Sequence, residues 1–255
     1  MSTTLPAGLG ERLLALAAAR QLLVCTDYDG TLAPLAPRPE LARLLPGASD
    51  LLYRLARLAH TRVAIISGRA RDNLRTHSGF ADPVLLVGSH GAELPGQALR
   101  SESATQLDAV EALLVPICAA SPGAWLERKP LGLTVHVRQA SVADAARVLD
   151  DVRSALLGHP ALNVTSGKAV LELSLSRVNK ADAVQWLREE QGDGTPVIYM
   201  GDDVTDETVF AALRDGDLGI KVGAGPTCAA YRVASEQDVL EVLQLLWQQR
   251  SGGGP

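Results

Sequence analysis

A short apolar run that ends in two acidic residues constrains this chain more than any other feature of its sequence. Residues 22–25 read Leu-Leu-Val-Cys, and after Thr26 come Asp27-Tyr28-Asp29-Gly30-Thr31. Such a run is typical of a strand buried on both faces of a parallel sheet. Side chains at i and i+2 of an extended chain point the same way, so Asp27 and Asp29 can face one ligand together.

Two carboxylates this close repel, and each raises the pKa of the other unless a cation lies between them. The pattern therefore predicts a metal site. One alternative is an ordinary surface turn, because Asp and Gly are common in turns. A calcium loop of the EF-hand type fits less well, because it needs Gly at its sixth position and Glu at its twelfth. Here Gly30 is fourth and Arg38 is twelfth.

Size and charge exclude several classes of protein. With 255 residues and 47% hydrophobic content, the chain can bury one large core or two modest ones. The net charge of −5 argues against a general electrostatic affinity for nucleic acid. Cys25, Cys118 and Cys228 are far apart and predict neither a disulfide framework nor a metal site, which favours a reducing compartment.

The sequence also argues against export and against a membrane span. No apolar run approaches the roughly 20 residues that a spanning helix needs. The apolar segment at residues 13–19 follows Glu11 and Arg12 and lacks the basic start of a signal peptide. We therefore expect a cytoplasmic protein. The sequence does not determine the oligomeric state, and a monomer is our working expectation.

Further buried strands are predicted at residues 63–66, 84–87, 196–200 and 218–222, with helical patterns among them. This alternation predicts an α/β fold with a Rossmann-like parallel-sheet core. Ligands bind beyond the carboxyl ends of the strands in such sheets. Ser67 and the segment Gly201-Asp202-Asp203 follow two of these strands, so we expect them to meet Asp27 at one edge.

The pattern changes near residue 100, where a helical segment at residues 104–120 precedes strands of alternating polarity. In residues 133–138 the polar side carries Thr134, His136 and Arg138, and in residues 168–173 Lys168 and Glu172 share a side. Between these strands, Ser141 begins a helix with Val142 on its inward face. We read residues 100–176 as an inserted α+β cap domain, and residues 1–99 with 177–255 as the core domain.

The strand ends carry the parts of a phosphoryl-transfer site. Asp27 could attack phosphorus, and Asp29 could protonate the departing alcohol and then deprotonate a water molecule. Ser67 would donate a hydrogen bond to the phosphoryl group, and Lys180 would offset its charge. Asp27, Asp29 and Asp202 would hold Mg²⁺ through oxygen atoms. Asp206 could hold the metal through water or support Lys180, and the sequence leaves both alternatives open.

The order of these residues resembles the four motifs of the haloacid dehalogenase superfamily of phosphoryl-transfer enzymes. Over about residues 20–245 the chain is similar, more narrowly, to the trehalose-6-phosphate phosphatases. The segments that carry this narrower resemblance are Ser67-Gly68-Arg69, Ser89-His90-Gly91-Ala92-Glu93, Glu127-Arg128-Lys129, His136-Val137-Arg138, Gly167-Lys168, Val178-Asn179-Lys180 and residues 201–207.

The resemblance implies a substrate, a cofactor and a set of sugar ligands. In that family the inserted domain is a cap that closes on the substrate, with hinges that we expect near residues 96–100 and 175–179. The resemblance implies that trehalose hydroxyls contact Glu127, Lys129, Arg138 and Glu172. Lys168 would help to position the substrate, and Arg69 would lie near the phosphate or the sugar.

The resulting expectation is a Mg²⁺-dependent phosphatase of trehalose biosynthesis, acting through an aspartyl-phosphate on a small-molecule substrate, trehalose 6-phosphate. Three alternatives stay open on the residues alone: a phosphatase for a related sugar phosphate, a sugar phosphomutase, and a metal- or sugar-binding regulator without catalysis. The cap's polar face could also be an ordinary solvated sheet face.

Overall fold

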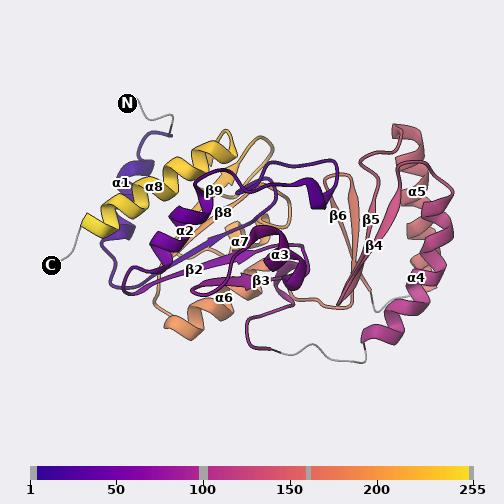
Figure 1. Cartoon of the computed structure of the whole chain (residues 1–255), viewed down its shortest axis with the longest axis horizontal. Helices are drawn as coiled ribbons and strands as arrows, with labels where there is room; N and C mark the ends of the chain where they lie inside the picture. Colours follow the sequence, from indigo (N-terminus) through magenta and orange to yellow (C-terminus); the bar gives the residue numbers. More distant parts are fainter. Residues whose placement is uncertain (1–4, 98–102, 159–161, 253–255) are drawn as a thin grey trace. The chain divides into compact units, whose positions relative to one another are not determined.

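The first part of the chain forms a six-stranded parallel sheet, in which every strand except β10 contains an apolar run (Figure 1). The computed structural model describes residues 5–97, 103–158 and 162–252. The sheet has the order β10-β9-β8-β1-β2-β3, and every pairing in it is parallel. Its strands are β1 (Leu22–Thr26), β2 (Thr61–Ile66), β3 (Val84–Val87), β8 (Val197–Gly201), β9 (Leu218–Val222) and β10 (Tyr231–Val233).

Helices cover both faces of this sheet. They are α1 (Leu9–Ala17), α2 (Ala48–Ala56), α3 (Arg71–Ser78), α6 (Lys180–Gln191), α7 (Glu207–Ala212) and α8 (Glu236–Gly252), with short 3₁₀ turns η1 (Pro39–Leu41) and η2 (Ser89–Gly91). Successive side chains of a strand point to opposite faces. Val24 accordingly packs with α1, α2 and α8, whereas Leu23 and Cys25 pack with α6 and α7.

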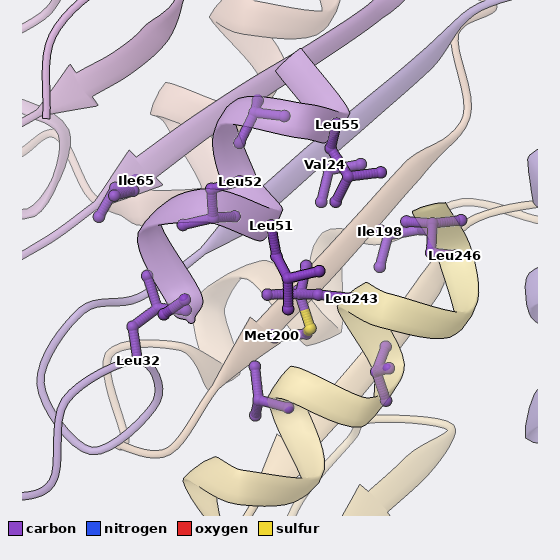
Figure 2. Close-up of a cluster of buried hydrophobic side chains, with 14 of the residues drawn as sticks. Val24, Leu32, Leu51, Leu52, Leu55, Ile65, Ile198, Met200, Leu243 and Leu246 are labelled. Atoms are coloured by element: carbon purple, nitrogen blue, oxygen red, sulfur yellow. The ribbon is translucent and has the colours of Figure 1, made fainter. Parts of the chain in front are cut away.

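Figure 2 shows part of the larger of these two cores. Leucines of α2 and α8, among them Leu52 and Leu243, meet Val24 and Met200 of the sheet. All four of these side chains are fully buried. Packing on both faces fixes the positions of the strands, and therefore of the loops that follow their carboxyl ends.

The second part of the chain has a different architecture. Its elements are α4 (Ser103–Ala119), β4 (Trp125–Lys129), β5 (Gly132–His136), α5 (Val142–Ala155), η3 (Leu156–Gly158), β6 (Asn163–Gly167) and β7 (Val170–Ser174). The strands form an antiparallel sheet with the order β4-β5-β7-β6. Buried residues of α4 and α5 pack on one face of this sheet, around Val135 and Leu171.

Contacts divide the chain into two compact units. The first comprises the residues up to Pro95 and those from Asn179 onward, and the second comprises Gly96–Val178. The segment predicted as an inserted domain, residues 100–176, falls within the second unit. Part of the expected hinge at residues 96–100 lies outside the described residues, and both hinges stay predictions. Among the described residues, no helix is long and apolar enough to cross a membrane.

Two local expectations were wrong. Val142, expected to face inward, is 90% exposed, because it is the first residue of α5 and the inward face begins further along with Val148 and Val152. Lys168 is not in a strand with Glu172. Ala169 has a φ of 62°, and this left-handed conformation turns the chain between β6 and β7, which pair from Gly167 and Val170. The strands β6 and β10 were not predicted.

Two adjacent leucines of α1 test the packing of the first unit. Leu13 is fully buried, whereas Leu14 is 56% exposed. We expect Leu13→Ala to lower the free energy of unfolding by about 2–5 kcal/mol, because it leaves a cavity in the core. Leu14→Ala should change it by about 0.5 kcal/mol or less. Urea titration measures both, and equal losses would contradict this assignment of the core.

Candidate active site

Lys180 lies buried between two carboxylates at the start of α6. Asn179 caps this helix: its side chain accepts hydrogen bonds from the backbone N–H groups of Ala181 and Asp182, and the Asp182 side chain accepts one from Asn179 N–H. This reciprocal pair of contacts is a capping box, and it fixes Lys180 at the first position of the helix. Its Nζ is 2.9 Å from Asp27 Oδ2 and 2.7 Å from Asp206 Oδ1, and the residue is only 1% exposed.

Asp206 is held by three donors. Lys180 Nζ and the Tyr199 hydroxyl donate to Oδ1, the latter at 2.6 Å, and Asp203 N–H donates to Oδ2 at 2.8 Å. Burial alone would raise the pKa of Asp206, but Lys180 and these hydrogen bonds outweigh it and lower the pKa. Burial would lower the pKa of Lys180, and the two carboxylates reverse that effect and raise it. Asp206 therefore supports Lys180 directly.

Asp27, Asp202 and Asp206 offer carboxylate oxygens that all lie within 4.8 Å of one another. Burial raises the pKa of Asp27 well above its usual range; Lys180 opposes this shift, and the Asp206 and Asp202 charges add to it. Bringing Asp202 this close requires Gly30, whose φ is 79° and where a Cβ would lie 2.4 Å from Asp202 Cγ. Lys221 Nζ also donates to the Asp202 backbone oxygen, at 2.6 Å.

The sequence places Asp29 with Asp27 and Asp202 around a metal, which stays a prediction, and in the structure the Asp29 carboxylate pairs with Arg69. Its two carboxylate oxygens accept hydrogen bonds from Arg69 Nε and Nη2, each at 2.7 Å. Arg69 is 5% exposed, and it also donates to the Pro39 carbonyl oxygen. A bidentate pair of this kind fixes the carboxylate strongly. The group of three close carboxylates therefore includes Asp206 rather than Asp29.

Ser67 follows β2, the strand that pairs directly with β1. It is 1% exposed, and its hydroxyl oxygen accepts a hydrogen bond from the backbone N–H of Arg69 at 3.1 Å. The backbone oxygen of Ser67 accepts another from His90 N–H at 2.9 Å. Ser67 and Asp27 thus follow adjacent parallel strands, at the same edge of the sheet.

The second unit carries a row of polar side chains across its antiparallel sheet, on the face opposite its helices. Glu127 is directly opposite Thr134, which is directly opposite Glu172. Both Glu172 oxygens lie 3.1 Å from Lys129 Nζ, and the Thr134 hydroxyl donates to Oε2 at 2.7 Å. Glu127 Oε2 lies 2.8 Å from His136 Nε2.

Arg138 and Lys168 lie beyond the strand ends of this sheet. Both are exposed, and Arg138 Nη2 donates to the backbone oxygen of Lys168 at 3.2 Å. The side chain within hydrogen-bond distance of the Glu127 carboxylate is His136. The structure thus gathers Glu127, Lys129 and Glu172 on one face, with Arg138 and Lys168 close to each other.

Sequence reasoning missed two contributors to these sites. Tyr199 reads as part of an apolar strand, yet its hydroxyl supports Asp206. A hydroxyl inside an otherwise apolar run was the available signal, because a buried tyrosine usually finds a partner for its hydroxyl. Lys221 gave a similar signal, since a lysine in the apolar run of β9 needs a partner when it is buried.

The first unit is a parallel sheet with aspartates beyond β1 and β8 and with the buried Lys180 at the start of α6. Between β3 and α6 the chain forms the antiparallel second unit. This arrangement is the fold of haloacid dehalogenase-like hydrolases. A hydrolase of that description from Bacteroides thetaiotaomicron shares the fold, with a TM-score of 0.57 and 15% identity over 88% of this chain and 99% of its own. The C-terminal domain of the C. albicans trehalose-6-phosphate phosphatase is more similar in structure. Its TM-score is 0.82, at 23% identity over 96% of this chain and 99% of its own.

Sequence comparison identifies the family within this class. The family model described as trehalose-phosphatase matches residues 25–239. A protein of Oryza sativa subsp. japonica named probable trehalose-phosphate phosphatase 4 is 32% identical, covering 94% of this chain and 70% of that protein. The chain belongs to the trehalose-phosphatase family and is a phosphoric monoester hydrolase.

Asp206→Asn tests the support of Lys180. Removing this buried charge should lower the free energy of unfolding by about 3 kcal/mol at neutral pH, because a buried cation loses an ionic partner. The pKa of Asp206 is lowered on folding, so its contribution is present above the unfolded pKa of about 3.9 and is lost as the pH falls further. Urea titrations at several pH values measure the difference.

Asp50→Asn is the matched control, because Asp50 pairs with Arg54 on the surface of α2 with 61% of its side chain exposed. That pair should contribute less than about 1 kcal/mol. A loss in Asp206→Asn no greater than in this control would contradict the supporting role.

Proposed function

We propose that the chain is a Mg²⁺-dependent phosphatase that hydrolyses trehalose 6-phosphate to trehalose and phosphate through an aspartyl-phosphate on Asp27, a step of trehalose biosynthesis. The observation that carries the proposal is the pairing of Asp27 with buried Lys180, with Asp202 within 4.8 Å, in a chain of the trehalose-phosphatase family. The three cysteines are free, in keeping with a cytoplasmic setting.

The carboxylate group fits a hard cation such as Mg²⁺. Mg²⁺ prefers oxygen ligands, binds through one or two carboxylates and keeps sites for water and substrate phosphate. Asp206 accepts hydrogen bonds from three donors, two of them side chains, whereas Asp27 accepts from Lys180 and from Tyr28 N–H, so we assign the ion to Asp27 and Asp202. A cation there would also favour the ionised form of Asp27, whose pKa is otherwise raised. When bound, it would neutralise charge on the phosphoryl group.

In the first step, an Asp27 oxygen attacks phosphorus, and the bond between phosphorus and the sugar oxygen breaks. Asp29 gives its proton to that oxygen, and trehalose leaves. Lys180 keeps Asp27 oriented and compensates its charge, and the Ser67 hydroxyl is free to rotate toward a phosphoryl oxygen. In the second step, water attacks phosphorus, Asp29 takes its proton, and the bond to Asp27 breaks to release phosphate.

Arg69 would interact with the general acid Asp29 before the substrate binds and with the substrate phosphate afterwards. Its guanidinium pairs with Asp29 through two hydrogen bonds. A phosphate dianion is an equally good bidentate partner for arginine. We infer that the substrate phosphate draws Arg69 away from Asp29, which leaves the Asp29 carboxyl group available to the departing sugar oxygen.

The second unit would supply sugar recognition. A neutral disaccharide needs placed donors and acceptors for its hydroxyls. The row of Glu127, Thr134 and Glu172, with Lys129 beside it, offers both kinds of group on one sheet face. Arg138 and Lys168 add exposed cations at the strand ends, and the second unit would act as the cap.

Phosphate release from three sugar phosphates tests the proposal. We expect kcat/KM for trehalose 6-phosphate to exceed the values for glucose 6-phosphate and sucrose 6-phosphate by at least about 100-fold, because a site that hydrogen-bonds each hydroxyl rejects analogues that leave its groups unpaired. Activity should disappear when EDTA removes Mg²⁺ and return when Mg²⁺ is added in excess.

Asp27→Asn is the control for the chemistry, because it preserves shape and removes the nucleophile. This variant should keep its fold by circular dichroism and lose phosphate release. Equal rates on all three sugars would refute the sugar assignment alone, whereas residual turnover in Asp27→Asn would exclude Asp27 as nucleophile. Isomerisation of the sugar phosphate without phosphate release would indicate a mutase.

A further inference from the structure

Trp125 and His136 form a stacked pair on the polar face of the second unit. They are directly opposite each other on β4 and β5. Their ring centroids are 3.8 Å apart, and the ring planes differ by 2°. Cross-strand aromatic pairs of this kind fix both rings relative to the backbone. The imidazole of His136 therefore has little freedom to rotate.

The fixed imidazole holds one oxygen of Glu127. His136 Nε2 lies 2.8 Å from Glu127 Oε2. Burial would raise the pKa of Glu127, but the hydrogen bond from His136 and the charge of Lys129 outweigh it, so the pKa is lowered. An ionised carboxylate can only accept, so Nε2 is the nitrogen that carries the proton. Oε2 is thereby committed to His136.

The two glutamates of this row are held in different ways. Glu172 engages Lys129 with both oxygens and also accepts from Thr134. Glu127 is held through Oε2 alone, and among the described residues its Oε1 accepts no hydrogen bond. The Glu127 side chain is 22% exposed, so this oxygen remains accessible to a ligand. Glu127 is thus an oriented acceptor with one oxygen left for a hydroxyl.

We propose that His136, held against Trp125, is a positioning residue that orients Glu127 so that Oε1 accepts a hydrogen bond from a sugar hydroxyl. The inference rests on the proposed function, because it takes the ligand of this face to be a sugar. It assigns to His136 and Trp125 a part in substrate selectivity that a purely structural cross-strand pair would not have.

His136→Phe tests the proposal, because phenylalanine keeps a ring against Trp125 and removes the donor. Kinetics are measured with trehalose 6-phosphate and with p-nitrophenyl phosphate, which carries no sugar. We expect KM for trehalose 6-phosphate to rise about tenfold with little change in kcat, so that the ratio of kcat/KM between the two substrates falls about tenfold. His136→Gln, which places an amide donor near the position of Nε2, should recover part of that ratio.

Val135→Ala is the matched control. Val135 precedes His136 in β5, is fully buried and faces α4 and α5, so this variant weakens the unit without changing the polar face. It should lower Tm and leave the substrate ratio as in the wild type. Glu127→Gln should lower the ratio by itself, and adding His136→Phe to it should lower the ratio little further, because both act through one hydrogen bond.

Three outcomes separate the claims. A His136→Phe variant that keeps the wild-type ratio would overturn this inference alone. Additive losses in the double variant would overturn it as well, because His136 would then act independently of Glu127. A wild type with no preference for trehalose 6-phosphate would overturn the proposed function and this inference together.

Discussion

The structure of the candidate active site depends on one buried cation, Lys180, held between Asp27 and Asp206. A lysine that is almost fully buried is tolerated only with charged partners, and here two carboxylates lie within hydrogen-bond distance of its Nζ. The Asn179 cap sets its position from the helix side, and Tyr199 with Asp203 N–H sets Asp206 from the other. These contacts orient the Asp27 carboxylate, which lies within 4.8 Å of that of Asp202. An oriented carboxylate of this kind suits the nucleophilic role that we propose for Asp27.

The chain contains two kinds of sheet, and they suit two different kinds of ligand. In the first unit, both faces of a parallel sheet are covered by helices, so its functional groups can only lie beyond the strand ends. In the second unit, helices cover one face of an antiparallel sheet, and the other face carries polar side chains in cross-strand register. Charge concentrated at an edge suits a phosphate and a cation. Donors and acceptors spread over a face suit the hydroxyls of a sugar.

The sequence predicted the elements in which the pattern of apolar and polar residues reflects which side chains are buried. Solid apolar runs identified β1, β2, β3, β8 and β9, and the acidic residues after β1 and β8 indicated the site. The strand β6 was missed because Asn163, Thr165 and Ser166 do not form an apolar pattern. Lys168 was misplaced because alanine rarely adopts the positive φ that Ala169 has. The Arg69–Asp29 pair joins residues 40 positions apart. A local sequence pattern does not indicate with which distant carboxylate an arginine forms an ion pair.

We propose that Asp27 and Asp202 together hold one divalent cation beside Lys180. The most direct measurement is Tm with and without saturating Mg²⁺ for the wild type, for Asp202→Asn and for Asp215→Asn, an exposed site with the same change of charge. Mg²⁺ at about 100 times its Kd should stabilise the wild type and Asp215→Asn by about 2.7 kcal/mol, and it should leave Asp202→Asn unchanged. An equal rise of Tm in all three proteins, or none in the wild type, would contradict the account.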